Sequence, residues 1–382
     1  MTPSPLRPER PPAFPDGLAF VRPAVPPLDR VVARLAPSYD RGILTNGPLV
    51  RRLEELVADR LGVRHAVAVA SCTSGLILAG RAVGLSGPTI MPSFTFSASA
   101  HSVVWAGASP RFIECDPDTF LADVADARAH LEGAGGLLIT HIFGAPAAPE
   151  EWAALARAAS IPLVFDAAHA FGSRRGGDPI GGFGDAEVFS FTPTKPVIAG
   201  EGGVVATRND DVAEYVRLGR EYGNPGDYDT QFVGLNARMS EFHAACALES
   251  LVDFDDHLAR RNQLAARARA QLAEIPGVRA QRLDPADTST WKDLTIAVDA
   301  ETFGATRDEL VAWLRADGID TRNYFDPPVH RQRSHAAAAD RPLPVTDAVA
   351  GAVVSLPIYP SLDDADVDRV ISVIGDVFAA GH

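Results

Sequence analysis

Residues 185–208 read DAEVFSFTPTKPVIAGEGGVVATR and contain two short apolar runs, 185–191 and 202–208, with a single lysine, Lys195, between them. Each run has the length and the mostly apolar character of a buried strand. The link between them is too short for a helical crossover, so we expect the two strands to be antiparallel. This stretch therefore predicts one antiparallel strand in a sheet, with Lys195 in the loop before it.

Upstream of this stretch the chain alternates between helical and strand-like segments. Apolar residues at helical spacing occur in segments 48–62, 74–84, 96–107 and 149–159. Short apolar runs typical of buried strands occupy segments 66–70, 89–93, 110–115, 136–142 and 162–168. This alternation predicts an α/β fold with a mostly parallel sheet that helices cover on both faces.

A long helical segment separates this region from the rest of the chain. Residues 239–275 contain neither proline nor glycine and predict one nearly uninterrupted helix. Shorter elements follow, namely a strand over 294–299 and helices over 306–318 and 363–380. We therefore expect an extended N-terminal tail over 1–25, a large domain over 26–250 and a smaller α+β domain over 251–382.

Charge and composition exclude several classes of protein. The formal net charge of −14 argues against a nucleic acid or an anionic membrane as the main partner. No apolar run approaches the roughly 20 residues that span a bilayer, and the N-terminus has no signal-peptide core. The three cysteines fit neither a metal site nor a disulfide framework. We expect a cytoplasmic protein without a metal site.

Lys195 lies between two prolines, in a loop that the flanking strands should hold close to the sheet. Burial disfavours the charged ammonium and lowers the pKa of a lysine. A lysine amine that has lost its proton attacks carbonyl groups and forms Schiff bases. The alternative is a side chain that reaches solvent or pairs with Glu201.

Residues 71–75, SCTSG, follow the first strand of the alternating region and begin a helix. Ligands of parallel sheets bind beyond the carboxyl ends of the strands. Hydroxyl groups such as those of Thr73 and Ser74, together with free backbone N–H groups at a helix N-terminus, form an anion site. The alternative is that these residues only cap the helix.

Three further polar residues follow the ends of later strands. Asp166 ends the run at 162–166, where a carboxylate needs a cationic partner. His169 follows three residues later, and Ser190 precedes the Lys195 loop. Taken singly, Asp166 is also consistent with a turn and His169 with a packed structural ring. Taken together, an anion site, a carboxylate, a hydroxyl and a lysine are the groups that pyridoxal phosphate requires.

With these residues in this order, the sequence resembles the fold-type-I pyridoxal-phosphate enzymes of the aspartate aminotransferase superfamily, and among them the DegT-like nucleotide-sugar aminotransferases. The similar segments are GILTNGPLVRRLEE (42–55), SCTSGL (71–76), MPSFTFSASA (91–100), DAAHAFGS (166–173), SFTPTKPVIAGEGGVV (190–205), GLNARMSEFHAA (234–245), YFDPPVH (324–330) and SLPIYP (355–360). The resemblance implies a seven-stranded, mostly parallel sheet between helices, followed by the smaller C-terminal domain.

The resemblance also implies roles for the residues already singled out. Lys195 would bind pyridoxal phosphate as a Schiff base and act as the catalytic base, and Asp166 would pair with the pyridine nitrogen. His169 would lie close to the ring, and Phe96 would stack on it. Some relatives carry histidine in place of the lysine and are dehydratases, so Lys195 indicates an aminotransferase.

Further residues follow from the same resemblance. Thr73, Ser74 and Ser190 would hold the phosphate, and Asn236 would reach the phosphate of the other subunit, which implies a homodimer with shared active sites. Tyr324 and His330 would line the sugar side of the pocket. Two positions depart from the pattern, because Cys72 stands where many relatives have glycine and Pro196 follows the lysine directly.

The implied reaction transfers an amino group from L-glutamate to a nucleotide-linked keto-deoxysugar. We expect a thymidine diphosphate 4-keto-6-deoxyhexose, in part because position 169 is histidine, and a product used in a natural product or a polysaccharide. The alternatives are a 3-keto sugar, glutamine as the donor, a keto-cyclitol of the scyllo-inosose type, and a regulatory homologue without activity.

Overall fold

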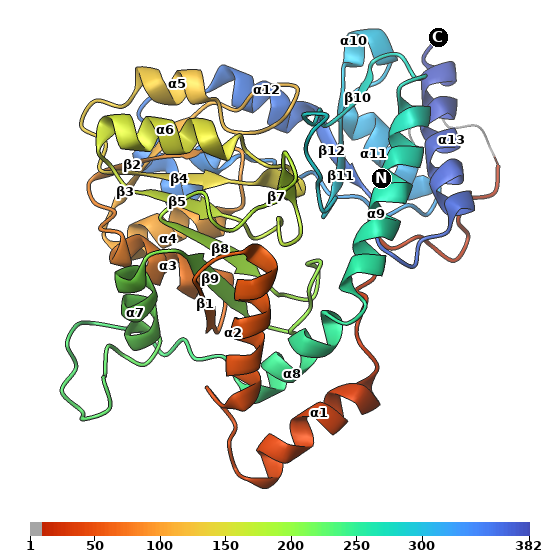
Figure 1. Ribbon diagram of the computed structural model, residues 1–382. Coiled ribbons are helices and arrows are strands. Elements are labelled where there is room, and N and C mark those ends of the chain that lie inside the picture. The colour runs from red at the N-terminus through yellow and green to blue at the C-terminus, as the bar shows by residue number, and fades with distance from the viewer. Residues whose placement is uncertain (1–9) are drawn as a thin grey trace.

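The computed structural model describes residues 10–382 and contains a large body built on a sheet and a smaller body beside it. Helix α9 (Phe254–Leu272) leads from the large body into the small one (Figure 1). The large body holds all the strands expected before residue 210, and the small body holds those after it. The predicted α/β class with a second, smaller α+β unit is confirmed.

A seven-stranded sheet forms the centre of the large body within residues 10–382. Its strands, in spatial order, are β1 (His65–Val69), β9 (Gly203–Thr207), β8 (Ala186–Ser190), β5 (Leu163–Asp166), β4 (Gly136–Thr140), β2 (Pro88–Pro92) and β3 (Ser109–Ile113). Strand β9 runs antiparallel to both of its neighbours, and the other pairs are parallel. Ser190 lies opposite Gly203, so the antiparallel pair predicted for residues 185–208 is confirmed.

Helices cover both faces of this sheet (Figure 1). One face carries α3 (Cys72–Ala82), α4 (Ser97–Ala106) and α7 (Asp210–Gly219), and the other carries α2 (Pro48–Leu61), α5 (Val124–Ala129) and α6 (Pro149–Ala159). Helix α3 lies directly on the sheet, since a Cβ atom added to Gly75 would come within 2.8 Å of Val188. This close contact fixes the position of the N-terminus of α3 relative to the strand ends.

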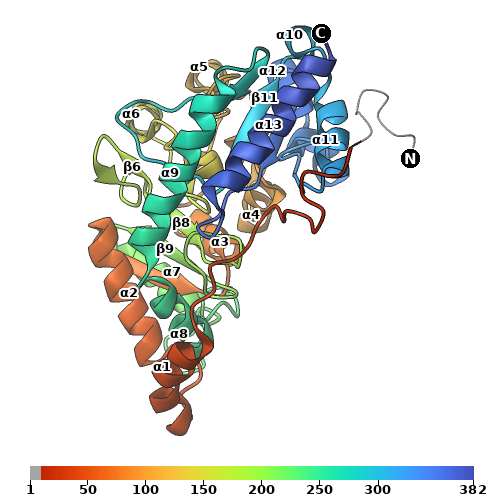
Figure 2. The same cartoon turned by 90° about the vertical axis from the view of Figure 1, so that its right-hand side faces the viewer.

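The small body is an antiparallel sheet of three strands with helices against it. Its elements are β10 (Val278–Ala280), β11 (Leu294–Val298), β12 (Val353–Leu356), α10 (Ala300–Phe303), α11 (Arg307–Ala316) and α13 (Asp364–Ala380). Figure 2 shows α9 and α13 side by side on this sheet. Their apolar faces form one buried core together with β11 and β12.

The chain before α1 (Leu28–Asp40) also contributes to the small-body core. Phe14 and Leu18 are buried there, and the N–H of Phe14 donates a 2.9 Å hydrogen bond to the carbonyl of Asp317. Residues 10–25 contain no helix. The predicted division into residues 1–25, 26–250 and 251–382 stays a prediction, and residues 1–9 lie outside the described range.

The prediction of one nearly uninterrupted helix over 239–275 is wrong. Helix α8 (Glu241–Ser250) ends before α9 begins at Phe254, and the chain changes direction between them (Figure 1). Phe254 is buried in the large-body core, with its ring 5.4 Å from that of Phe171. Ser250 accepts a 3.0 Å hydrogen bond from the N–H of Ile198. These contacts outweigh the helix propensity of residues 251–253.

Several elements were not predicted. They are α1, α5, α7, α10, β10, β12, α12 (Pro344–Ala352), the two short strands β6 (Arg174–Arg175) and β7 (Asp178–Pro179), and the 3-10 turns at Ile142–Gly144, Val329–Arg331 and Arg333–Ala338. None of the helices in residues 10–382 combines the length and the hydropathy that a helix needs to cross a membrane.

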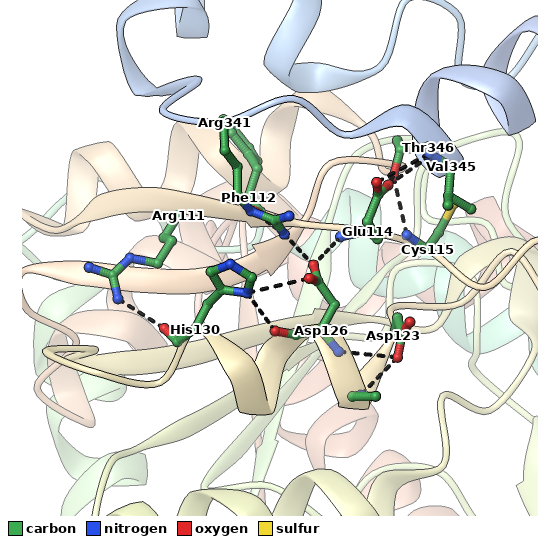
Figure 3. A network of polar contacts seen from close by, with 11 residues as sticks. Arg111, Phe112, Glu114, Cys115, Asp123, Asp126, His130, Arg341, Val345 and Thr346 are labelled. Carbon is green, nitrogen blue, oxygen red and sulfur yellow. Dashed lines mark hydrogen bonds and ion pairs between the residues drawn. The ribbon is translucent and has the colours of Figure 1, made fainter.

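Carboxylates at the edge of the large sheet fix the segment that leads into α12 (Figure 3). Glu114 accepts hydrogen bonds from the N–H of Val345 (3.1 Å) and from the N–H of Thr346 (2.7 Å). Asp126 forms an ion pair with Arg341 in the same segment. The first turn of α12 and the residues before it are thereby attached to the large body.

Candidate active site

A cavity of about 360 Å³ lies at the carboxyl ends of β5 and β8, between the large sheet and segments of the small body. Of the predicted site residues, those that line the cavity are Thr73, Phe96, Asp166, His169, Ser190, Lys195 and Tyr324. Ser74, Asn236 and His330 do not line it. The structure therefore brings together most of a set of residues that the sequence spreads over some 250 positions.

The N-terminus of α3 forms one end of the cavity. The hydroxyl of Ser71 accepts a 3.1 Å hydrogen bond from the N–H of Ser74, and the Ser74 hydroxyl donates to the Ser71 carbonyl at 2.8 Å. Ser71 is thus the N-cap of α3, and Ser74 completes a capping box with it. Thr73 lines the cavity from the first helical turn, where backbone N–H groups lack intrahelical acceptors. This end suits an anion.

Asp166 ends β5 at the floor of the cavity. Its carboxylate accepts hydrogen bonds from the hydroxyl of Ser99 (2.6 Å) and from the N–H of Ala168 (3.1 Å). Burial raises the pKa of Asp166, and the Ser99 hydrogen bond partly offsets that rise. No ion pair within residues 10–382 includes Asp166. A buried carboxylate in this setting is ready to accept a cationic ligand group.

Lys195 extends from the loop between β8 and β9 into the same cavity. Burial lowers the pKa of Lys195 to about 8, and the neighbouring Lys292 ammonium contributes to the decrease. The described ion pairs include none between Lys195 and Glu201, so the pairing alternative is not seen. At pH 7 roughly a tenth of the Lys195 amine is therefore unprotonated, a far larger share than in an ordinary lysine, and the unprotonated amine is the nucleophile.

His169 is buried beside the cavity and is held as a neutral ring. Its Nδ1 accepts a 3.1 Å hydrogen bond from the N–H of Phe143, and its ring lies within 14° of parallel to that of Phe143. Burial lowers the pKa of His169 well below its ordinary value. The ring is thus both a packed structural element and part of the cavity wall.

Aromatic side chains form the remaining wall. Phe96 is 59% exposed although it lines the cavity, and its ring centroid is 6.4 Å from that of Phe325. Tyr324 stacks against Phe325 with centroids 5.2 Å apart. An exposed aromatic ring at a cavity offers a flat surface to a planar ligand ring.

The two remaining predicted residues lie elsewhere. His330 is buried, with Nδ1 2.7 Å from the Ser93 hydroxyl and Nε2 3.2 Å from Asp347, so its ring is engaged in structural contacts. Asn236 is exposed and pairs through its backbone with Glu221. Neither residue touches the cavity of its own chain.

Lys292 and Asp293 line the cavity but were not found from the sequence. The Lys292 ammonium donates a 2.6 Å hydrogen bond to Asp293, and both side chains are buried. A signal was present, because Lys195 and Lys292 are the only lysines among the 35 lysine and arginine residues of the chain.

The residues present fit pyridoxal phosphate. The donor set combines a lysine of lowered pKa, a buried carboxylate without a cationic partner, hydroxyl groups and a helix N-terminus. The lysine matches the aldehyde of that cofactor, and the carboxylate matches its pyridine nitrogen. The hydroxyl groups and the helix N-terminus together match its phosphate. Fold and cavity together are those expected of a pyridoxal-phosphate-dependent enzyme.

Residues 29–375 match the model of the DegT/DnrJ/EryC1/StrS aminotransferase family, and the chain belongs to this family. It is 34% identical to the GDP-perosamine synthase of Caulobacter vibrioides over 87% of this chain and 90% of that protein. It is 32% identical to a UDP-N-acetyl-3-dehydro-alpha-D-glucosamine 3-aminotransferase of Acidithiobacillus ferrooxidans, over 91% of this chain and 93% of that protein.

Solved structures agree with this assignment. The structure of DesI in the presence of its TDP-sugar product superposes with a TM-score of 0.91 and 37% identity. The match covers 97% of this chain and 95% of that chain. The resemblance to the DegT-like family, the fold class and the aminotransferase class, each predicted from sequence, are confirmed.

Proposed function

We propose that this chain binds pyridoxal phosphate through Lys195 and transfers an amino group from L-glutamate to a nucleotide-linked keto-deoxysugar. The observation that carries the proposal is the placement of Lys195 and Asp166 in one cavity, at the ends of neighbouring strands β8 and β5. When bound, pyridoxal phosphate supplies an aldehyde that accepts an amine and a ring that withdraws electrons from the substrate.

Each side chain in the cavity would then have its own role toward the cofactor or the substrate. Asp166 would hold a proton on the pyridine nitrogen, because an adjacent carboxylate favours the charged form of a cation. Phe96 and His169 would orient the ring. Thr73, Ser190 and the backbone N–H groups at the start of α3, whose capping box includes Ser74, would hold the phosphate. Lys195 Nζ would accept and return the proton of the substrate carbon, for which its lowered pKa is suited.

For the acceptor we propose a thymidine diphosphate 4-keto-6-deoxyhexose. Two relatives support a sugar acceptor, since one is named as a synthase of a GDP-linked sugar and one was solved with a TDP-sugar product. Tyr324 lines the cavity on the small-body side, where the sugar would lie. The product would be an amino sugar for a natural product or a polysaccharide.

A 3-keto sugar is the second candidate, because the relative from Acidithiobacillus ferrooxidans is named as a 3-aminotransferase. A keto-cyclitol remains the third. These acceptors are distinguished by incubating the purified protein and L-glutamate with 4-keto and 3-keto nucleotide sugars and with scyllo-inosose. We expect turnover of the 4-keto sugar, whereas turnover of scyllo-inosose alone would overturn the sugar proposal.

We also propose that the active protein is a homodimer. Several large apolar side chains are exposed on α1, α4, α8 and the loop that ends at Asn236, among them Trp105 (68%) and Tyr228 (94%). Exposed apolar groups of this kind mark interaction surfaces. An exposed Asn236 within this region is suited to reach the cavity of a partner subunit rather than its own.

The cofactor part of the proposal has a direct test. Protein purified with added pyridoxal phosphate should acquire a visible absorption band that disappears on dialysis against an amine donor. A protein that acquires no such band is no pyridoxal-phosphate enzyme, and the same result would favour a regulatory homologue without activity. The cytoplasmic location stays a prediction.

A further inference from the structure

The cavity contains every lysine of the chain. The chain has 35 lysine and arginine residues, and the 33 that are not Lys195 or Lys292 are arginines. Lys195 has an assigned purpose in the proposed function, but Lys292 has none. Apart from Lys195, Lys292 is the one position at which this chain has lysine rather than arginine, and it lines the cavity.

Contacts between the two bodies set the position of Lys292. Its backbone N–H donates a 3.0 Å hydrogen bond to the carbonyl of Phe143, whose own N–H binds His169. Two residues earlier, the Thr290 hydroxyl donates to the carbonyl of His169 at 2.6 Å. Gly144 makes this approach possible, because a Cβ atom there would lie 2.0 Å from the Thr290 hydroxyl. Lys292 is therefore fixed at the His169 end of the cavity.

The charges around the cavity show which ligand group Lys292 suits. The charged residues that line it are Asp166, Lys195, Glu201, Lys292 and Asp293. If Lys195 binds the cofactor, Lys292 is the one lining cation left for a second ligand. Lys292 is only 6% exposed, so the anion that reaches it must be small.

From these contacts we infer that Lys292 is the binding group for a carboxylate of the amino donor, with Asp293 as its partner whenever no carboxylate is bound. The inference rests on the proposed function, because it assumes an amino-acid donor. The two substrates of the proposed reaction differ in charge at the reacting end, where the amino acid is anionic and the sugar is neutral. One cavity must accept both.

The Lys292–Asp293 pair meets this requirement. Asp293 is 1% exposed and directly adjacent in sequence, and it neutralises Lys292 when the neutral sugar is present. Lysine carries a compact ammonium on a flexible stem that can exchange partners, whereas the planar fork of arginine favours a fixed bidentate pair. A partner that changes during each reaction cycle accounts for a lysine in a chain otherwise rich in arginine.

The test uses an inert dicarboxylate, glutarate, and its uncharged diamide, glutaramide. Their dissociation constants are measured by titration calorimetry on the holoenzyme of the wild type and of the variants Lys292→Gln, Lys292→Arg and Asp293→Asn. We expect Lys292→Gln to weaken glutarate binding roughly tenfold to a hundredfold and to leave glutaramide unaffected. Asp293→Asn should keep glutarate binding within about threefold, since it retains the cation. Lys292→Arg should bind glutarate with an affinity between those of Lys292→Gln and the wild type, because its planar fork pairs more firmly with Asp293.

Other outcomes overturn the inference. The inference is wrong if Lys292→Gln binds glutarate with wild-type affinity. It is also wrong if Lys292→Gln and Asp293→Asn lose glutarate affinity equally, because equal losses indicate that the two residues form a structural pair. A second measurement needs no variant, because glutarate, but not glutaramide, should protect Lys292 of the wild type from acetylation. If the protein takes up no pyridoxal phosphate, the proposed function fails. If it transfers amines but shows no effect of Lys292, only this inference fails.

Discussion

Ser99 donates a 2.6 Å hydrogen bond to Asp166, and this contact joins α4 to the end of β5 at the floor of the cavity. The hydroxyl stabilises the ionised form of a carboxylate whose pKa burial raises. The proposed function needs that ionised form, because only a carboxylate can keep a pyridine nitrogen protonated. Ser99 is thereby a positioning residue, although it was not singled out from the sequence.

Replacing Asp166 by Asn should weaken cofactor retention and lower kcat together. A neighbouring carboxylate raises the pKa of a cation by about 1 to 3 units, so its loss should reduce the rate roughly tenfold to a thousandfold. Steady-state kinetics and dialysis of the bound cofactor measure both effects. Asp363→Asn, at an exposed position before α13 without a capping hydrogen bond, is the matched control. Wild-type kinetics in Asp166→Asn would contradict the role.

Ser99→Ala should shift the pH dependence of the reaction. Removal of the hydrogen bond takes away an interaction that lowers the pKa of Asp166, so the pKa rises further. Activity requires the ionised carboxylate and is lost as the pH falls through that pKa. The acidic limb of the kcat profile should therefore move to higher pH in Ser99→Ala. An unchanged limb would show that Asp166 does not control it.

Lys195 in the cofactor-free protein should lose its proton about two and a half pH units below an ordinary lysine. Burial lowers the pKa of Lys195 to about 8, from an ordinary value of 10.5. Acetylation at a series of pH values, followed by mass spectrometry of the Lys195 peptide, gives the midpoint directly. We expect half-maximal reactivity near pH 8, and a midpoint near 10.5 would mean that the amine is solvated.

The same shift has a consequence for stability. Between pH 8 and pH 10.5 the unfolded chain binds a proton at Lys195 that the folded, cofactor-free protein does not bind. The free energy of unfolding should therefore rise with pH across this window, as far as Lys195 contributes. Urea unfolding of the wild type and of Lys195→Met at both pH values isolates that contribution, and an equal pH dependence in the two proteins would contradict it.

The sequence predicted those features that depend on local patterns. The strand–helix alternation, the antiparallel pair at 185–208 and the residues at strand ends follow from apolar runs and their neighbours. The break at 251–253 could not be predicted, because Phe254 turns toward Phe171, which is 83 positions away. The placement of Lys292 depends on hydrogen bonds from segment 290–292 to Phe143 and His169, and no local pattern encodes those contacts.

Mixing two inactive variants tests whether the active site is shared. If Asn236 acts in the cavity of the other subunit, Lys195→Ala and Asn236→Ala are each impaired, but a mixed dimer contains one intact site. Random subunit exchange should restore about a quarter of the wild-type activity. Size-exclusion chromatography with light scattering confirms the dimer. Absence of any recovery, with exchange demonstrated by mass, would place Asn236 outside the site.

The contact between the two bodies at Gly144 should be intolerant of a side chain. Gly144 has φ +98°, and a Cβ atom would lie 2.0 Å from Thr290. We expect Gly144→Ala to lower the free energy of unfolding by about 1 to 3 kcal/mol, from backbone strain alone. Gly351→Ala is the control, since a Cβ atom there meets nothing within 4 Å and the residue lies in α12. Equal stability of the two variants would contradict the expected steric restriction.

The central claim is that Lys195 holds pyridoxal phosphate, and borohydride reduction of the holoenzyme tests it most directly. Reduction fixes the cofactor to its lysine, and the chain has only two lysines. Peptide mass spectrometry should find the pyridoxyl phosphate group on Lys195, and none in Lys195→Ala, which should still bind the cofactor non-covalently through the remaining contacts. A label on Lys292, or no label on either lysine of a cofactor-saturated protein, would contradict the assignment.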